Sequence, residues 1–181
     1  MRFWDSSAIV PLLVNEAASA RLAMIYSTDP EMVVWWGTEI ECASALERRG
    51  RIQGGAAAEA MSRALRQLDQ FTERWHEIGP TQQVRRLARR LLRRHSLRAA
   101  DALQLAAALA ARGDQPMSLE FVCADDRLNT AARDEGLTIL APDTAMEPAA
   151  RPYKVSQTRR PVSRQAVQSR VRRRTAKQGA A

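Results

Sequence analysis

Short apolar segments that favour β-strands alternate with longer helical segments over about the first 141 residues of the chain. Strands alternating with helices are typical of an α/β domain built around a mostly parallel sheet, which is the fold class that we predict. Met32–Trp36 is apolar throughout, as expected for a buried parallel strand. The segments that we expect to form strands are Arg2–Trp4, Met32–Trp36, Phe121–Cys123 and Leu137–Leu140.

Between these strands, apolar residues recur at the spacing of one helix face. The longest such pattern runs from Met61 to Ile78 and is ended by Gly79-Pro80, which predicts one long amphipathic helix. The other expected helices cover about residues 7–26, 38–49, 84–94, 98–112 and 128–135.

Positive charge is concentrated at the C-terminal end. The 181-residue chain carries 28 Lys and Arg against 20 Asp and Glu, a formal net charge of +8, which points to a polyanionic partner such as nucleic acid. Residues 148–181 hold ten of the basic residues and no acid, so residues 1–147 have a net charge of −2. We therefore expect one folded domain over 1–147 and a basic, disordered tail over 148–181. The tail is either a solubilising extension or an arm that lies along phosphates.

Other features argue against secretion and against a membrane protein. Asp5 lies where a signal peptide needs apolar residues, and the longest strongly apolar run, Ala102–Ala111, is too short to cross a bilayer. Cys42 and Cys123 have neither CxxC spacing nor disulfide density, so we expect two buried thiols in a protein of the reducing cytoplasm. The sequence has no glycine-rich loop for nucleotide phosphates and only two histidines, too few for a three-histidine metal site.

Asp5 and Asp125 each follow an expected strand. In α/β sheets, sites form beyond the carboxyl ends of strands near a topological switch point, so these two carboxylates are expected at the same edge of the sheet. Each also has a purely structural interpretation, because an Asp just before a helix commonly caps it. Asp126 is the second acid of this segment, and either it or Asp125 could be the cap.

Glu41 and Asp101 are carboxylates close to apolar helix faces. Thr38-x-x-Glu41 matches a capping box, yet Glu41 also lies at the edge of a core-facing stripe, where a shared site is a better place for it than bulk water. Asp101 is surrounded by apolar residues at helical spacings, and an unpaired carboxylate there would be costly. Asp101 could instead form a salt bridge to Arg94 or Arg98, or it could belong to a shared site. We favour the shared site, because Asp is also a mediocre helix residue.

Four segments, taken together, resemble the PIN-domain ribonucleases, and most closely the VapC-type toxins of bacterial toxin–antitoxin systems. They cover about residues 1–141 and read WDSSAIV, TEIECASALERR, LRAADALQLAAAL and CADDRLNTAARDEGLTIL. The resemblance implies a three-layer α/β sandwich and a cognate antitoxin as partner. A homodimer is a further assembly that the chain could form. The resemblance also implies Mg²⁺ or Mn²⁺ as the metal and, as site residues, an acidic quartet with a hydroxyl beside it: Asp5, Glu41, Asp101 and Asp125, with Ser7. Two features depart from the family pattern: Cys123 stands where a threonine is usual, and the basic tail has no counterpart.

The chemistry of such a site follows from its ligands. Four carboxylates that converge on one cavity repel each other, so without a cation at least one should hold a proton. Oxygen ligands without histidine suit Mg²⁺ or Mn²⁺ better than Zn²⁺. We predict hydrolysis of RNA phosphodiester bonds, with Asp5, Asp101 and Asp125 mainly as metal ligands. Glu41 is either a ligand through water or the group that helps deprotonate the attacking water. The alternative is a non-catalytic nucleic-acid-binding module that uses the tail and the arginine-rich helix Arg85–Arg94.

Overall fold

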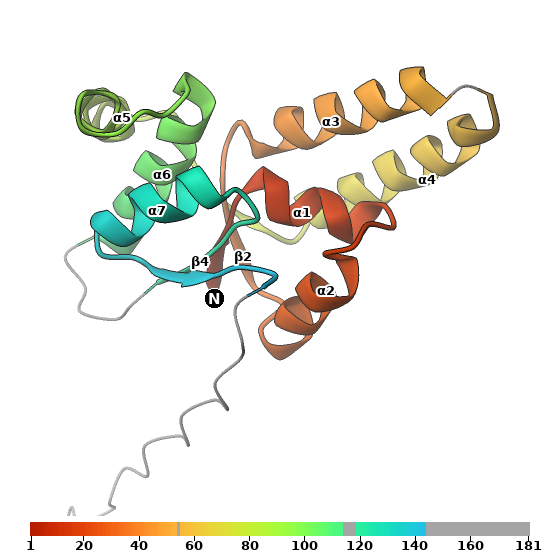
Figure 1. Ribbon diagram of the computed structural model, residues 1–181, viewed down its shortest axis with the longest axis horizontal. Helices are drawn as coiled ribbons and strands as arrows, with labels where there is room; N and C mark the ends of the chain where they lie inside the picture. The colour runs from red at the N-terminus through yellow and green to blue at the C-terminus, as the bar shows by residue number, and fades with distance from the viewer. Residues whose placement is uncertain (54, 114–118, 144–181) are drawn as a thin grey trace, which may run out of the picture. The chain divides into compact units, whose positions relative to one another are not determined.

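Five parallel strands form one sheet in the computed structural model, which describes residues 1–53, 55–113 and 119–143 (Figure 1). The strands stand in the order β3-β2-β1-β4-β5, and every neighbouring pair is parallel. The predicted tail, 148–181, lies outside the described residues. The strand bounds are β1 Arg2–Trp4, β2 Met32–Trp35, β3 His76–Ile78, β4 Glu120–Val122 and β5 Thr138–Leu140.

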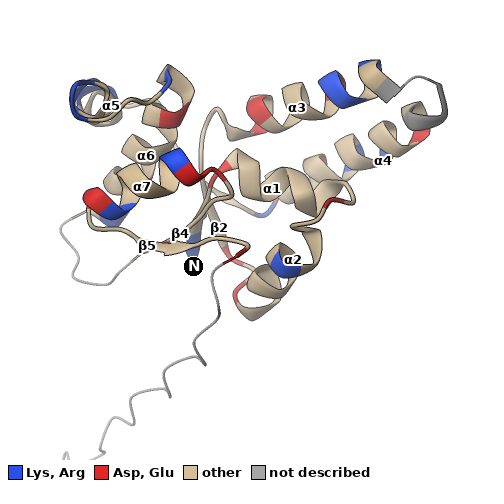
Figure 2. Cartoon of the chain, viewed as in Figure 1, with Lys and Arg blue, Asp and Glu red and all other residues tan. Residues whose placement is uncertain are grey.

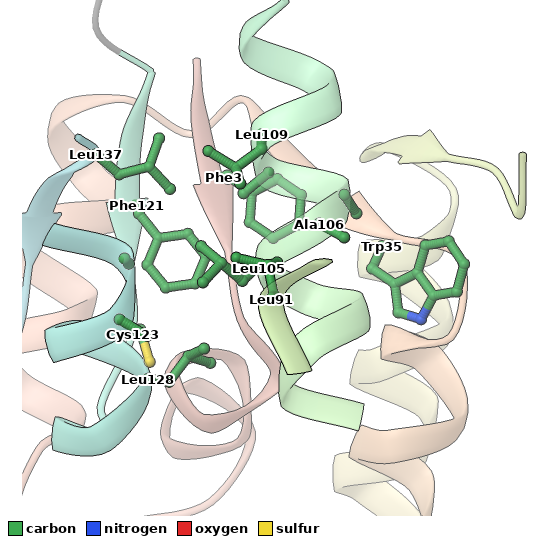
Figure 3. Packing of buried hydrophobic residues seen from close by; sticks show 14 of the residues in the cluster. Phe3, Trp35, Leu91, Leu105, Ala106, Leu109, Phe121, Cys123, Leu128 and Leu137 are labelled. Carbon is green, nitrogen blue, oxygen red and sulfur yellow. The ribbon is translucent and has the colours of Figure 1, made fainter. Parts of the chain in front are cut away.

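Helices cover both faces of this sheet. Alternate strand residues point to opposite sides, so the strands place apolar side chains on both faces, and each face packs against helices. Phe3 stacks on Phe121 at 5.6 Å between ring centroids, and both pack with apolar residues of α5, α6 and α7 (Figure 3). Trp4 and Val122, one residue further along, pack with residues of the other four helices. The predicted α/β sandwich with a parallel sheet is therefore confirmed. The helix bounds are α1 Ser6–Leu13, α2 Ser19–Thr28, α3 Thr38–Gln53, α4 Gly55–Thr72, α5 Gln82–Arg94, α6 Ala99–Arg112 and α7 Asp126–Asp134.

The sheet has its topological switch point between β1 and β4. From β1 the chain adds β2 and then β3 on one side, and later returns to add β4 and β5 on the other. The ladder continues past the strands, since the backbone N–H of Asp5 donates to the carbonyl of Val122 at 3.0 Å. Asp5 thus lies at the carboxyl edge of the sheet where the strand order reverses, the place where open α/β sheets form their sites.

The helix expected over residues 7–26 is in fact two helices. Val14 is extended (φ −136°, ψ 152°) and ends α1. Ser19 then begins α2, and its hydroxyl oxygen accepts the N–H of Glu16 at 2.8 Å and lies 2.6 Å from the carbonyl oxygen of Pro11. These contacts satisfy backbone groups that a continuous helix would have paired internally, so the turn is stable at this point.

The prediction of one long helix through Ile78 is also wrong, because α4 ends at Thr72. The chain leaves α4 and forms the edge strand β3, which pairs with β2. Trp75 is buried among residues of the α4 side of the sheet, while Ile78 packs against the opposite cluster, so their helical spacing is coincidental. His76 and Glu77 are exposed, and so β3 has no apolar run that would have indicated a strand.

The turn from β2 into α3 depends on a glycine. A Cβ on Gly37 would lie 2.6 Å from Nε1 of the Trp35 indole, closer than non-bonded atoms approach. The buried Trp35 ring can therefore lie against the backbone here, and the chain enters α3 directly after β2. Both cysteines, Cys42 and Cys123, are buried free thiols, as expected. No described helix combines the length and apolar character needed to span a bilayer.

Candidate active site

Asp5 is a buried carboxylate between β1 and α1. Its side chain is the N-cap of α1, and Oδ2 accepts the backbone N–H of Ser7 at 2.8 Å. Only 4% of the residue is exposed. Asp5 thus caps α1, as one of its two interpretations predicted; the cap does not decide whether Asp5 also belongs to a site.

The surroundings of Asp5 disfavour its charge. Burial raises the pKa of Asp5 from 3.8 to about 6, because the carboxylate loses its hydration. The hydrogen bonds from Ser7 oppose this shift, and the negative charges of Glu41 and Asp101 add to it. Acids from α3 and α6 therefore act electrostatically on the acid that follows β1.

Glu41, on the first turns of α3, is held by two side-chain donors rather than by a capping box. Its Oε2 accepts the hydroxyl of Ser6 at 2.8 Å and the amide of Gln104 at 2.9 Å. Thr38 is fully buried, and its hydroxyl accepts a second N–H of the Gln104 amide at 3.1 Å. α3 begins at Thr38 itself, so Thr38 lies inside the helix and is not its N-cap, and Glu41 is tied to α1 and α6.

Gln104 is the residue of this region that sequence reasoning missed. It is 1% exposed and joins Thr38 and Glu41, which lie more than 60 positions away, to α6. One signal could have found it: Gln104 is a polar residue inside the apolar run Ala102–Ala111, three positions after Asp101. Buried amides are normally hydrogen-bonded, so a polar partner for it was to be expected.

Asp101 is half-buried in the first turn of α6. Its Oδ2 accepts the backbone N–H of Arg98 at 3.3 Å, as a residue near a helix N-terminus often does. The alternative of an ion pair with Arg94 is not realised, because Arg94 lies 3.4 Å from Glu135 instead.

Asp125 follows the end of β4 closely and caps α7. Its Oδ1 accepts the backbone N–H groups of Arg127 and Leu128 at 2.8 and 3.0 Å. The adjacent Asp126 is exposed in the first turn of α7. Asp125 is thus the acid of this pair that is the cap.

Ser7 connects α1 to the loop that carries Asp125. Its hydroxyl oxygen accepts the backbone N–H of Ala124 at 3.0 Å and lies 3.6 Å from the sulfur of Cys123. That sulfur in turn accepts the backbone N–H of Asp125 at 3.3 Å. A thiol therefore makes these contacts at the position where the resemblance leads us to expect a threonine. Burial also raises the pKa of the Cys123 thiol well above its ordinary value, so it remains protonated.

Asp5, Glu41 and Asp101 are close enough to interact electrostatically, and Ser7 joins the start of α1 to the loop that precedes Asp125. Within the described ranges, no three His, Cys, Asp or Glu side chains lie close enough together to hold a metal ion as they stand. An open groove of about 550 Å³ begins at Ser6, Ser7 and Glu41, and continues along α3 to Arg48 and Arg49. Figure 2 shows acidic residues near the start of α3 and basic residues toward its other end.

Comparisons with known proteins agree with this architecture. A family model described as "PIN domain" matches residues 2–145. The fold is similar to a toxin–antitoxin complex from Klebsiella pneumoniae, with a TM-score of 0.54 and 15% identity over 78% of this chain and 98% of that chain. It is equally similar to FitAB bound to an IR36 DNA fragment, with a TM-score of 0.54 and 16% identity over 81% of this chain and 99% of that chain. No curated protein matches significantly. At such identities the two structural likenesses concern the fold.

Proposed function

This chain belongs to the PIN domain family, and from that premise we propose that it is a metal-dependent ribonuclease that hydrolyses RNA phosphodiester bonds. The observation that carries the proposal is the position of Asp5. It is a buried acid with a raised pKa at the topological switch point, under the electrostatic influence of Glu41 and Asp101. Perturbed acids in such a place are candidates for catalysis or for binding a cation.

The donor set fits a hard divalent cation. Its members are carboxylates, and carboxylate oxygens without histidine suit Mg²⁺ or Mn²⁺. Asp5, Asp101 and Asp125 would hold the ion, with Glu41 bound directly or through water. When bound, such an ion supplies activation of a water molecule and neutralisation of charge on the phosphate. Burial is the main cause of the raised pKa of Asp5, and a cation would offset the smaller contribution that comes from the charges of Glu41 and Asp101.

The protein's own residues orient the reacting groups. Ser6 and Gln104 hold one oxygen of Glu41, which limits the directions from which this carboxylate can accept a proton from water. Ser7 keeps the loop of Asp125 against α1. The caps of α1 and α7 hold Asp5 and Asp125 in place, because each carboxylate accepts backbone N–H groups.

Substitution of single acids tests the proposal. Asp5→Asn and Asp101→Asn should each reduce Mg²⁺-dependent cleavage of RNA by orders of magnitude while the protein stays folded, because the metal loses an anionic ligand. Asp126→Asn is the matched control, since Asp126 is a neighbouring exposed acid outside the quartet. The measurement is mapping of new RNA ends, together with the melting temperature. Cleavage at the wild-type rate by folded Asp101→Asn protein would contradict the metal-site assignment.

Metal binding can be tested without activity. Mg²⁺ or Mn²⁺ should raise the melting temperature of the wild type, because a ligand that binds only the folded state stabilises it. The same ions should leave the melting temperature of Asp101→Asn unchanged. A non-catalytic nucleic-acid-binding module, the alternative function, would show no difference between the two proteins. It would also use the arginines of α5, of which Arg90 and Arg94 already pair with Glu135.

We further propose that the protein is the toxin of a type II toxin–antitoxin pair. Support comes from the fold shared with a chain of a Klebsiella pneumoniae structure titled as a toxin–antitoxin complex. A basic side chain from an antitoxin would offset the repulsion among the acids by bidentate hydrogen bonds. The product of the neighbouring gene should therefore co-purify with the wild type. Harmless overexpression of active wild type without a partner would count against the toxin assignment.

A further inference from the structure

The groove beside the acids has a basic end that the proposed catalysis does not use. Glu41, Ser44 and Arg48 line it from α3, at spacings of three and four residues. Residues at these spacings share one helix face, and Arg48 lies about 10 Å further along the helix axis than Glu41. The groove thus extends from the candidate active site to a guanidinium group that lies beyond it.

Arg49 brings a second guanidinium to the same groove, and this group is only partly satisfied. Its Nη2 pairs with Glu16, which also lines the groove. Its Nη1 is buried and has no hydrogen-bond partner. Nη1 itself is therefore closed to a ligand, but the Arg49 side chain as a whole is 36% exposed and lines the groove.

Arg48 is exposed, and within the described part of the chain no acid lies at ion-pair distance from it. Glu16 is the acid of this end of the groove, and Arg49 occupies it. The basic end therefore has one exposed guanidinium, that of Arg48, whose charge no acid of the described residues neutralises. Guanidinium groups bind phosphate oxygens by paired hydrogen bonds, which makes a phosphate the acceptor that fits.

We propose that Arg48 and Arg49 form a phosphate subsite for the RNA substrate. It binds a phosphate of the strand other than the scissile one, and so sets the direction in which the strand leaves the acids. This assignment rests on the proposed function. It also meets an electrostatic need, because residues 1–147 are net negative and the site itself is acidic.

Binding by the full chain tests the subsite. In the inactive Asp101→Asn background, Arg48→Ala should weaken binding of a single-stranded RNA oligonucleotide about tenfold, the effect of one charge-assisted hydrogen bond. The slope of log K against log salt should fall by about 0.7. Arg51→Ala is the matched control, because Arg51 is an exposed arginine in the last turn of the same helix and does not line the groove. Equal binding by the Arg48→Ala and Arg51→Ala proteins overturns the proposal.

Substrate length provides a second readout that a folding defect would not imitate. With the otherwise wild-type chain, Arg48→Ala should raise KM and leave kcat nearly unchanged for longer oligonucleotides, since a remote phosphate contact binds ground and transition states alike. For a dinucleotide, whose single phosphodiester is at the acids, Arg48→Ala should have no effect. Arg48→Lys should restore part of the affinity, because it keeps the charge but not the paired geometry. The same loss at every substrate length overturns the proposal.

The outcomes separate the subsite from the proposed activity. RNA that binds in an Arg48-dependent way but is never cleaved by the wild type contradicts the ribonuclease assignment and supports the subsite. If the Arg48→Ala protein cleaves RNA as the wild type does, the ribonuclease assignment is supported and the subsite is overturned. Arg48→Ala protein that binds RNA normally but no longer captures the neighbouring gene's product also overturns it, and assigns the groove to a protein partner.

Discussion

At the scale of single residues, the pKa of the Asp5 carboxyl group depends strongly on its surroundings. In the unfolded chain its pKa is near 3.8, and burial in the folded protein raises it to about 6. The folded state therefore holds the proton more tightly than the unfolded state does. The free energy of unfolding should therefore fall as the pH rises from about 4 to about 6, because Asp5 loses its proton over this range. From the size of the pKa shift, the decrease is roughly 3 kcal/mol.

Asp5→Asn should consequently stabilise the metal-free protein at neutral pH. Asparagine keeps the N-cap and carries no charge to desolvate. Urea unfolding in EDTA should show a higher free energy of unfolding for Asp5→Asn than for the wild type at pH 8, and a much smaller difference at pH 4. A difference that is the same at pH 4 and pH 8 would show that the charge of Asp5 is not what destabilises the fold.

Gln104 is the residue through which α6 holds Glu41. Gln104→Leu should lower kcat for RNA cleavage about 10- to 100-fold with little change in KM, a typical effect of losing a group that orients a metal ligand. Thr38→Val is the matched control, because it removes the Thr38 partner of Gln104 and leaves the Gln104 bond to Glu41. If Thr38→Val and Gln104→Leu lower stability and kcat equally, Gln104 has only a structural role.

At the scale of elements, the acids share a position at the starts of helices. Asp5 and Asp125 are the N-caps of α1 and α7, and Asp101 lies in the first turn of α6. The parallel strands β1 and β4 deliver the chain to one edge of the sheet, where α1 and α7 begin with unpaired N–H groups, whereas α6 follows α5. The positive end of each helix also favours a nearby carboxylate. Capping and a place in the candidate site are therefore compatible for these residues.

Two substitutions at Asp125 separate its cap from its proposed metal ligation. Asp125→Ala should lower the stability by about 1 kcal/mol, the usual cost of losing an N-cap, and should also abolish cleavage. Asp125→Ser keeps a capping oxygen but no carboxylate, so it should be nearly as stable as the wild type and still inactive. Denaturant unfolding and RNA cleavage measure the two effects. Wild-type cleavage by Asp125→Ser would leave Asp125 as a cap only.

At the scale of the whole molecule, the excess of positive charge and the candidate site belong to different parts of the chain. The ten basic residues of 148–181 contrast with a net charge of −2 over residues 1–147. Deleting 148–181 should leave the fold and the metal-dependent cleavage intact, since the strands and the four acids all precede this segment. RNA affinity should fall, and the salt slope should decrease by about 0.7 for each phosphate that the shortened protein no longer binds.

Cleavage and RNA binding by the 1–147 fragment over a range of KCl concentrations measure this effect. The weakening should appear in KM or Kd rather than in kcat, because uniform electrostatic binding favours the ground and transition states equally. An unchanged affinity and salt slope would make the tail a solubilising extension. An insoluble fragment would show that the tail packs on the rest of the protein.

The sequence alone was enough to predict the α/β class, four of the five strands and the positions of Asp5 and Asp125 just after two of those strands. These features are local, because the direction of side chains repeats regularly along a strand or a helix and leaves a pattern of apolar residues. β3 left no such pattern, since two of its three side chains are exposed at the sheet edge. The turn between α1 and α2 was equally hidden, because its stability comes from contacts of Ser19 with residues earlier in the chain.

Only the tertiary structure decided which partners the candidate site residues have. The hydrogen bond from Gln104 to Glu41 joins residues 63 positions apart, and it exists because α3 and α6 both begin at the carboxyl edge of one sheet. The same packing gave Thr38 a buried contact to Gln104. It also buried Asp5 enough to change its pKa. Burial and long-range pairing follow from how elements pack against each other, and no periodicity within a single segment encodes that arrangement.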